Sequence, residues 1–165
     1  MHIAGIVAQA RLDSPLGPLT AVATDRGLAG LWFDGQAHHP GRLSAPENSR
    51  HPVLRQVQRE LEHYWQDPRS PFTVSLDLQG TGFQRRVWRA LLKIRPGTTS
   101  TYGAIAARAG SPAAARGAGA ALGRNPVSII VPCHRVLGRD GSLTGYAGGL
   151  ARKRALLRLE SASSS

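Results

Sequence analysis

The sequence predicts an α/β protein of the α+β type, in which a small N-terminal antiparallel β-sheet domain with one helix precedes a mostly helical C-terminal domain. Short β-like runs separated by turn residues fill the beginning of the chain. Apolar residues at helical spacing, preceded by helix-capping residues, fill the second half. The balance of charge changes near residue 79, where we expect the boundary between domains 1–79 and 80–160.

Three β-like runs open the chain, at residues 6–12, 19–24 and 28–33. Turn-rich residues 13–18 join the first two runs, and Asp25-Arg26-Gly27 precedes the third. This order predicts an antiparallel meander. Residues 34–51 have turn-forming composition and no periodicity, so we expect a long surface loop there.

The expected loop contains His38-His39, and histidine pairs occur in metal sites. No partner ligand lies nearby in the sequence, so a solvated pair is the favoured interpretation. After the loop, residues 52–66 predict a helix. Its apolar residues recur at helical spacing: Val53, Val57, Leu61, Tyr64 and Trp65. Residues 72–78 alternate in polarity and predict one more strand.

Thr81-Gly82-Phe83-Gln84 has the capping-box pattern that begins a helix. We expect this helix to stop at Pro96-Gly97. Residues 98–109 predict a second helix, capped by Ser100 or Thr101, with Tyr102, Ile105, Ala106 and Ala109 facing inward.

Gly110 suits the left-handed position at the end of the second helix. Ser111-Pro112 is expected to open a third helix, with the serine as N-cap and the proline at the first helical position. Two short helices around a tight glycine turn predict a helix-turn-helix.

The third helix is unusual in composition, because residues 113–121 are alanine and glycine except for Arg116. Each interior glycine costs about 1 kcal/mol relative to alanine. Tight packing against another helix explains the glycines as well as close approach to another molecule does. A helix with few side chains suits the narrow minor groove of DNA better than the major groove.

Charge is distributed unevenly along the 165-residue chain. Residues 1–79 carry 7 arginines and 8 acidic residues, a net charge of −1, whereas residues 80–165 carry 14 basic and 2 acidic residues, a net charge of +12. A strongly basic half indicates a polyanion-binding module. An arginine-rich genome would affect both halves and would not remove acidic residues from one of them.

Targeting and membrane signals are not apparent in the sequence. No run approaches 18 apolar residues, and the first residues lack a basic segment followed by a long apolar run. We therefore expect a cytoplasmic protein without a membrane partner.

Cys133 is the only cysteine, which excludes internal disulfides and multi-cysteine metal sites. A lone cysteine is usually an inert core residue. Activation of a thiol needs a base and a positive environment, which His134 and Arg135 supply in sequence. An apolar strand at residues 128–131 is expected to lead into this segment. In a continued strand Cys133 and His134 would point to opposite faces, so their cooperation requires a turn or a bridging water.

The segment Pro132-Cys133-His134-Arg135-Val136 is preceded by Arg124-Asn125-Pro126 and followed by Thr144-Gly145-Tyr146-Ala147-Gly148-Gly149. This string resembles the active-site signature of the O6-alkylguanine-DNA alkyltransferases, also called methylated-DNA:protein-cysteine methyltransferases. The resemblance extends without a gap over residues 82–160 and more loosely over the N-terminal half. It favours a reactive Cys133 over an inert one.

The resemblance implies a DNA-repair transferase without a cofactor, acting as a monomer. Its partner would be double-stranded DNA, bound through the minor groove. O6-alkylguanine, with O4-alkylthymine as a second candidate, would be flipped from the duplex and would give its alkyl group irreversibly and stoichiometrically to Cys133. Some family members bind zinc in the N-terminal half through cysteines and histidines. This half has no cysteine, so we predict no metal.

Roles for individual residues follow from the resemblance. It makes Cys133 the acceptor, His134 a base that acts through water and Glu160 the carboxylate that holds the imidazole. Asn125 corresponds to a hinge between the recognition helix and the cysteine segment. Tyr102 corresponds to a tyrosine that crowds a backbone phosphate and contacts the flipped base.

The remaining predicted residues bind DNA or line the base pocket. Arg116 corresponds to an arginine finger that fills the gap left in the base stack. The residues expected to bind DNA are Arg116, Tyr102, Ala115, Gly119, Arg124 and Arg135. The residues expected to line the base pocket are Tyr146, Ala147, Val136 and Leu122. In this pocket Tyr146 would stack on the base, the Ala147 N–H would lie near O6, and the Cys133 and Val136 carbonyls near the exocyclic amine.

Other interpretations remain open at the level of sequence. Glu160 ends an expected helix with Ala151, Ala155 and Leu159 on one row, and without the resemblance a solvated charge at the helix end is favoured. A helix-turn-helix regulator or a damage sensor would need no cysteine at position 133. A cysteine hydrolase would need no recognition helix and no basic domain. Residues 161–165 are expected to be a disordered tail.

Overall fold

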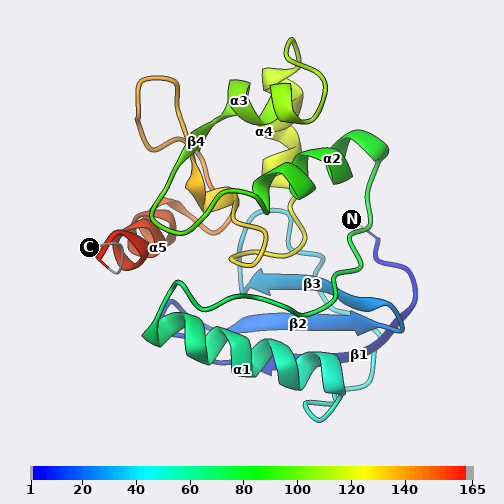
Figure 1. Cartoon of the computed structure of the whole chain (residues 1–165). Coiled ribbons are helices and arrows are strands. Elements are labelled where there is room, and N and C mark those ends of the chain that lie inside the picture. The colour runs from blue at the N-terminus through cyan, green and yellow to red at the C-terminus, as the bar shows by residue number, and fades with distance from the viewer. Residues whose placement is uncertain (1, 163–165) are drawn as a thin grey trace.

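A three-stranded antiparallel sheet forms the N-terminal half of the computed structural model, which describes residues 2–162 (Figure 1). Its strands, in the spatial order β1-β2-β3, are Ile6–Leu12, Leu19–Thr24 and Gly27–Phe33. The predicted meander is confirmed, and β3 begins one residue earlier than expected because Gly27 already pairs with Thr24. Helix α1 (Pro52–Gln66) lies along one face of the sheet, and the helical half lies on the other side (Figure 1).

Two short segments pair with β3 along the edge that β2 leaves free. Leu28 N–H donates to Ser75 O at 2.8 Å, and Asp77 N–H donates to Leu28 O at 2.8 Å. Farther along β3, Leu31 exchanges hydrogen bonds with Pro126 and Ser128. The prediction of a regular strand at 72–78 is therefore wrong. This segment forms only one isolated bridge to β3, at Leu76, and residues 126–128 occupy the rest of that edge. This sharing attaches the segment before Cys133 to the sheet.

Helix α1 has the predicted bounds. The His51 ring accepts a hydrogen bond from Val53 N–H at 3.2 Å and so caps the helix, while Pro52 occupies the first turn. The buried face includes Glu60, whose carboxylate accepts bonds from the backbone of Thr73 and Val74 at 2.9 and 3.2 Å. A buried carboxylate thus fixes the chain that leaves α1.

The C-terminal half begins with α2 (Gly82–Leu91), and the predicted capping box between Thr81 and Gln84 is confirmed. The helix ends at Leu91, earlier than Pro96-Gly97, because the chain turns at residues 92 and 93. The next helix, α3 (Tyr102–Arg108), is capped by Thr101. It starts later than expected because Ser100–Thr101 form strand β4, which pairs in parallel with β5 (Val136–Leu137).

Helix α4 (Ala115–Gly123) follows α3 after a turn at Gly110, which has the predicted left-handed φ of 81°. The prediction that Ser111 caps this helix is wrong. Ser111 N–H bonds to Ala106 O and so finishes α3, whereas Ala114 precedes α4 without a side-chain cap. The two helices pack together as the expected helix-turn-helix pair.

The glycines of α4 contact aromatic side chains at ordinary distances. A Cβ added to Gly117 would lie 3.4 Å from the Phe83 ring, and one added to Gly119 would lie 3.7 Å from the Tyr102 ring. Alanine therefore fits at both positions within this chain, and packing between helices does not require glycine.

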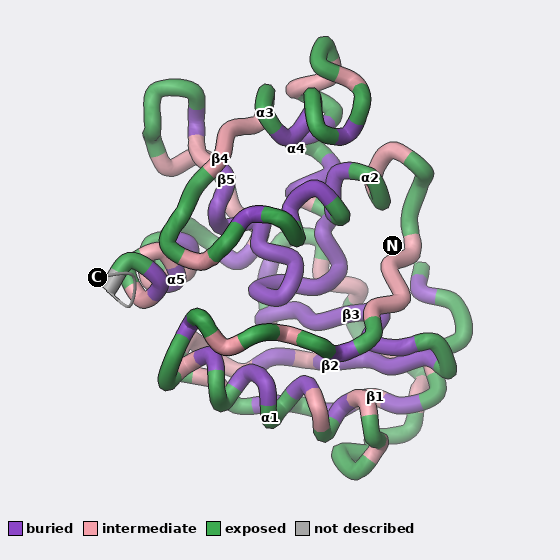
Figure 2. Tube along the Cα trace, viewed as in Figure 1, coloured by how far each residue is buried: buried purple, intermediate pink, exposed green. Residues whose placement is uncertain are grey.

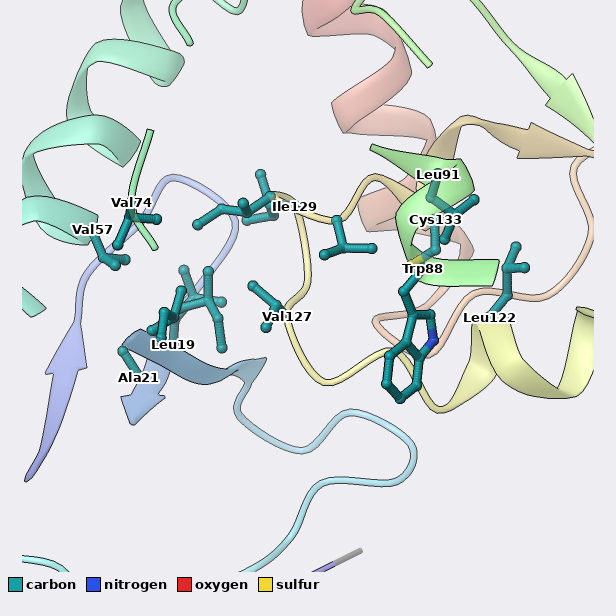
Figure 3. Packing of buried hydrophobic residues seen from close by; sticks show 14 of the residues in the cluster. Leu19, Ala21, Val57, Val74, Trp88, Leu91, Leu122, Val127, Ile129 and Cys133 are labelled. Carbon is teal, nitrogen blue, oxygen red and sulfur yellow. The ribbon is translucent and has the colours of Figure 1, made fainter. Parts of the chain in front are cut away.

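A continuous buried core joins the sheet to the helical half (Figure 2). Figure 3 shows this core running from Leu19 on the sheet through Val127 and Ile129 to Trp88 and Cys133. The Trp88 indole N–H donates to the Ala121 carbonyl at 2.8 Å and so ties α2 to α4. The cysteine thus lies at the end of a packed core.

The last helix, α5 (Leu150–Ala162), contains Glu160 near its end, as expected. Its inward side chains include Lys153, Leu156 and Glu160, whereas Ala151 is exposed. Ser161 and Ala162 extend the helix, so the expected tail is wrong for these two residues. Residues 163–165 lie outside the described part of the chain.

Between residues 2 and 162, no helix is long and apolar enough to cross a membrane. Within the same range, no group of three or more histidine, cysteine or acidic side chains is placed to hold a metal ion.

Candidate active site

The segment that presents the cysteine consists of consecutive turns. The strand expected at 128–131 is wrong: Val127 forms a single bridge to β3, Val131 N–H bonds back to Val127 O at 3.0 Å, and Ile129 has a left-handed φ of 72°. Cys133–Arg135 then form a 3₁₀ turn. The sequence indicated that Cys133 and His134 could cooperate directly only if the chain turned there, and it does turn.

Asn125 holds this segment through its side-chain amide. Its Oδ1 accepts from Val127 N–H at 2.9 Å, and its Nδ2 donates to Val131 O at 2.8 Å and to the Cys133 sulfur at 3.2 Å. The residue is buried, so these bonds are shielded from water. Asn125 therefore fixes both ends of the segment from Val127 to Val131 and the sulfur of Cys133, which follows it.

Cys133 is almost fully buried, with 6% of its surface exposed. Burial raises the pKa of its thiol to about 11, although the Asn125 bond and the positive charge of Lys153 act in the opposite direction. At neutral pH the resting sulfur is therefore a thiol, and a reaction at this sulfur requires removal of its proton.

His134 and Glu160 form a buried pair next to the cysteine. His134 Nε2 lies 2.7 Å from Glu160 Oε2, and both side chains are at most 1% exposed. Burial lowers the pKa of His134, although the Glu160 carboxylate acts in the opposite direction. The lowered pKa favours a neutral ring. With Nε2 donating to Glu160, Nδ1 carries the lone pair, and it has no partner among residues 2–162. This nitrogen is available to accept a proton.

Besides the bond with His134, Glu160 accepts hydrogen bonds from Arg135 of the same turn and from Tyr64 of α1. Arg135 Nε and Nη2 donate to its two oxygens at 2.8 Å each, and Tyr64 OH of α1 donates at 2.6 Å. Burial opposes ionisation of Glu160, but the bonds from Arg135 and His134 outweigh it and lower its pKa to about 2. The alternative of a solvated charge at the helix end is wrong.

Arg135 does not lie where the sequence predicted. It is 6% exposed, and its guanidinium donates to Glu160 and to the Ile94 carbonyl. The prediction that Arg135 contacts DNA is contradicted, because a buried and paired guanidinium cannot reach a phosphate on the surface. It is also not the charge that favours the thiolate, a role that falls to Lys153.

Two residues of the site, Lys153 and Tyr64, were not predicted from the sequence. Lys153 is 1% exposed, and its Nζ donates to Val136 O at 2.7 Å and to Thr144 O at 3.1 Å. Within the described chain it has no acidic partner. Lys153 is one of two lysines in a chain whose other basic residues are arginines. This rarity was the feature of the sequence that could have drawn attention to it. Nothing in the sequence near Tyr64 indicated that it reaches the site.

A cavity of about 340 Å³ opens beside the cysteine. Its lining residues are Ala37, His38, Tyr102, Gly119, Leu122, Gly123, Cys133, Gly145, Tyr146 and Ala147. Of the predicted pocket residues, Tyr146, Ala147 and Leu122 line it and Val136 does not, because the Val136 side chain is buried and its carbonyl accepts from Lys153. A larger hollow of about 490 Å³ between the chain start and Arg85 contains no predicted site residue.

Two tyrosines that line the cavity differ in their hydrogen bonds. The Tyr146 hydroxyl is buried and has no hydrogen-bond partner in the described chain. The Tyr102 hydroxyl, in contrast, is hydrogen-bonded to the Thr144 side chain. Of these two rings, only that of Tyr102 is therefore held by a hydrogen bond of its hydroxyl.

The predicted DNA-binding residues other than Arg135 lie on the helix-turn-helix or just after it. Arg116 and Arg124 are exposed, and Ala115 and Gly119 are half-buried. Tyr102 begins α3, next to Gly119. An exposed helix thus adjoins the mouth of the cavity.

Comparison with known proteins connects this geometry to one family. Residues 82–162 match the DNA-binding domain and residues 7–78 the ribonuclease-like domain of 6-O-methylguanine DNA methyltransferase. The chain is 47% identical to the methylated-DNA–protein-cysteine methyltransferase of Mycolicibacterium paratuberculosis and 42% identical to that of Methanosarcina barkeri. Both alignments cover 90% of this chain, and they cover 89% and 94% of those proteins.

A solved structure is similar over nearly the whole chain. The Mycobacterium tuberculosis protein OGT in complex with DNA superposes with a TM-score of 0.86 at 44% identity, covering 95% of this chain and 94% of that one. The chain belongs to the 6-O-methylguanine DNA methyltransferase family.

Proposed function

We propose that this protein is a methylated-DNA–protein-cysteine methyltransferase that repairs O6-alkylguanine in DNA by transferring the alkyl group to Cys133. One observation carries the proposal: the only cysteine lines an open cavity and is adjacent in sequence to a buried His134–Glu160 pair. The relatives named above carry this activity in their names, and the solved relative binds DNA.

The chemistry is a displacement at carbon. The Cys133 sulfur forms a bond to the alkyl carbon while the bond from that carbon to guanine O6 breaks. His134 Nδ1 takes the thiol proton through a water molecule, and Glu160 stabilises the resulting imidazolium. The guanine leaves as an anion and takes up the proton that His134 removed from the thiol, so the products are unmodified guanine and a thioether. No group in the site can cleave a thioether, so each molecule reacts once.

Groups that line the cavity would recognise the flipped base. The Ala147 N–H would donate to guanine O6 and so favour its departure, while Tyr146 would stack on the base. Tyr102 would contact the base and crowd the backbone phosphate. Extrusion of the nucleotide costs a few kcal/mol, which weak pairing of the damaged base reduces.

Helix α4 would enter the minor groove of duplex DNA and the protein would act as a monomer. Packing within the chain does not require glycine at positions 117 and 119, which favours close approach to an external surface. Arg116, exposed on this helix, would fill the gap left by the flipped base. The excess of positive charge after residue 79 would supply phosphate contacts.

We further propose that residues 1–79 form a scaffold domain that supports the reacting groups and does not bind DNA. Tyr64 of α1 donates to Glu160, and β3 pairs with residues 126–128. The net charge of this half is −1, which disfavours DNA. The scaffold would hold the cysteine segment in one conformation.

The test is mass spectrometry of the protein after incubation with a duplex containing O6-methylguanine. The proposal expects a mass gain of one methyl group, located at Cys133 by peptide sequencing. A damage sensor or a regulator would bind without gaining mass, and a cysteine hydrolase would release its product. Either result would overturn the proposal.

A further inference from the structure

A segment of the N-terminal half reaches the cavity beside Cys133. It follows β3 and comprises residues 36–38, at the start of what the sequence predicted to be a surface loop. Gln36 is buried, and its Oε1 accepts from Phe33 N–H at 2.9 Å and from the Ser128 hydroxyl at 3.2 Å. Ala37 N–H donates to Ala147 O at 2.9 Å. The segment is therefore anchored to both sides of the site.

This anchoring separates the two histidines of the His38-His39 pair. His38 has a left-handed φ of 59° and lines the cavity together with Cys133. The His39 ring packs against Trp32 with 6.0 Å between ring centroids, and its Nδ1 accepts from Gly41 N–H. Histidine tolerates a left-handed backbone better than most residues. Only His38 thus belongs to the active-site cavity, and its exposure puts it at the mouth.

We propose that residues 36–38 form the outer wall of the substrate pocket and that the His38 side chain limits how bulky an O6 substituent the protein accepts. The proposal rests on the proposed function. It concerns alkylguanines that carry more than a methyl group, for which O6-benzylguanine in DNA is the test substrate.

The geometry of the displacement supports this assignment. The reacting carbon must lie between the Cys133 sulfur and guanine O6, so any further atoms of the substituent must occupy cavity space that the base leaves free. Ala147, whose N–H would bind O6, accepts a bond from Ala37 through its carbonyl. Ala37 and His38 line the same cavity as Cys133 and Ala147, so a bulky substituent shares this space with the 36–38 segment, where His38 is the largest side chain.

The rest of the lining leaves this role to His38. Three glycines, Gly119, Gly123 and Gly145, contribute no side chain. Tyr102 is held by its bond to Thr144, and Leu122 belongs to the core. His38 is an exposed side chain of a loop, so its replacement can change pocket size without disturbing the core.

The experiment compares single-turnover rates on two duplexes that differ only in carrying O6-methylguanine or O6-benzylguanine. The variants are His38→Asn and His38→Gly, because both residues tolerate a left-handed φ and they remove the ring in two steps. His63→Asn, at an exposed histidine of α1, is the matched control. Circular dichroism and the rate on the methyl substrate report whether each variant is folded.

We expect the ratio of benzyl to methyl rates to rise from wild type to His38→Asn to His38→Gly, by about tenfold in total, since one methylene equivalent in a pocket is worth at least that factor. The methyl rate should change less than the benzyl rate in both His38 variants, and the His63→Asn ratio should equal the wild-type ratio. An unchanged or lower ratio in both variants, with methyl transfer intact, overturns the inference alone. Failure of the wild type to transfer methyl overturns the proposed function and the inference together.

Discussion

Arg135 and Glu160 form a buried bidentate ion pair, with Arg135 Nε 2.8 Å from Oε1 and Nη2 2.8 Å from Oε2 of the carboxylate. The arginine is adjacent in sequence to His134, which bonds to the same carboxylate. One acidic side chain therefore positions two successive residues of the reactive turn. Arg135 has a structural role here, which leads to the first prediction.

Arg135→Met should destabilise the protein by about 3 kcal/mol, because it leaves a buried carboxylate without its strongest partner. It should leave the salt dependence of DNA binding unchanged. Arg124→Ala, at an exposed arginine, should show the reverse: little loss of stability and a salt slope reduced by about 1. Urea unfolding and binding titrations at several salt concentrations measure both. A reduced slope for Arg135→Met would return this residue to the DNA interface.

Lys153→Met should raise the pKa of Cys133 further, because the lysine charge is one of the influences that lower it. The rate of alkyl transfer should fall at neutral pH and recover in part as the pH rises. The pH dependence of single-turnover transfer from free O6-benzylguanine measures this without a contribution from DNA binding. Lys93→Met, at an exposed lysine of the same half, should leave the profile unmoved. A transfer rate lowered by the same factor at every pH would indicate that Lys153 only supports the fold.

Stability in acid should depend on Glu160. Its folded pKa of about 2 lies below the ordinary value of 4.5, so its stabilisation is present above pH 4.5 and is lost as the pH falls toward 2. Urea midpoints measured between pH 2 and 7 should therefore decline more steeply in this window for the wild type than for Glu160→Gln. Glu62→Gln, at an exposed position of α1, should keep the wild-type slope. Equal slopes for wild type and Glu160→Gln would contradict the lowered pKa.

Features determined by neighbouring residues could be predicted from the sequence. The capping box at Thr81–Gln84, the turn glycine at 110 and the bounds of α1 each depend on side chains a few positions apart. The cysteine turn was suggested only indirectly, as one way for Cys133 and His134 to cooperate. Its cause is the Asn125 side chain, which replaces the hydrogen bonds of a strand.

Features that depend on distant contacts could not be predicted. Tyr64 is hydrogen-bonded to Glu160, which lies 96 positions later in the sequence. Ser128 is hydrogen-bonded to Gln36, which lies 92 positions earlier. An arginine beside a cysteine looks the same in sequence whether it faces DNA or a buried carboxylate, which is why Arg135 was assigned to the wrong surface. His38 and His39 likewise could not be distinguished in the sequence. Only the anchoring of the loop places His38 in the cavity and His39 against Trp32.

Arg116→Ala should slow repair of a duplex far more than reaction with free O6-benzylguanine, because the free base needs no extrusion. Arg116 is the only long charged side chain of α4 and is exposed. Single-turnover rates on both substrates give the comparison, with Arg124→Ala as a control for lost charge. Equal slowing on the two substrates would show that Arg116 does not assist base flipping.

Cys133 itself allows the most direct test, because it is the only thiol and the proposed product is a stable thioether. Excess duplex containing O6-methylguanine should transfer at most one methyl group per chain and then stop. Cys133→Ser should keep its DNA affinity, since the charges and the helix-turn-helix are untouched. It should transfer nothing, because a hydroxyl is too weak an acid for His134 to ionise usefully through water.

Labelled-methyl transfer measured against protein concentration decides between stoichiometric and catalytic action. A plateau at one methyl per chain, with S-methylcysteine at position 133, agrees with the displacement at a buried thiol that His134 and Glu160 assist. Several methyl groups removed per chain would require a group that regenerates the thiol. Transfer that survives in Cys133→Ser would require a different acceptor, and either result would exclude the single-turnover mechanism.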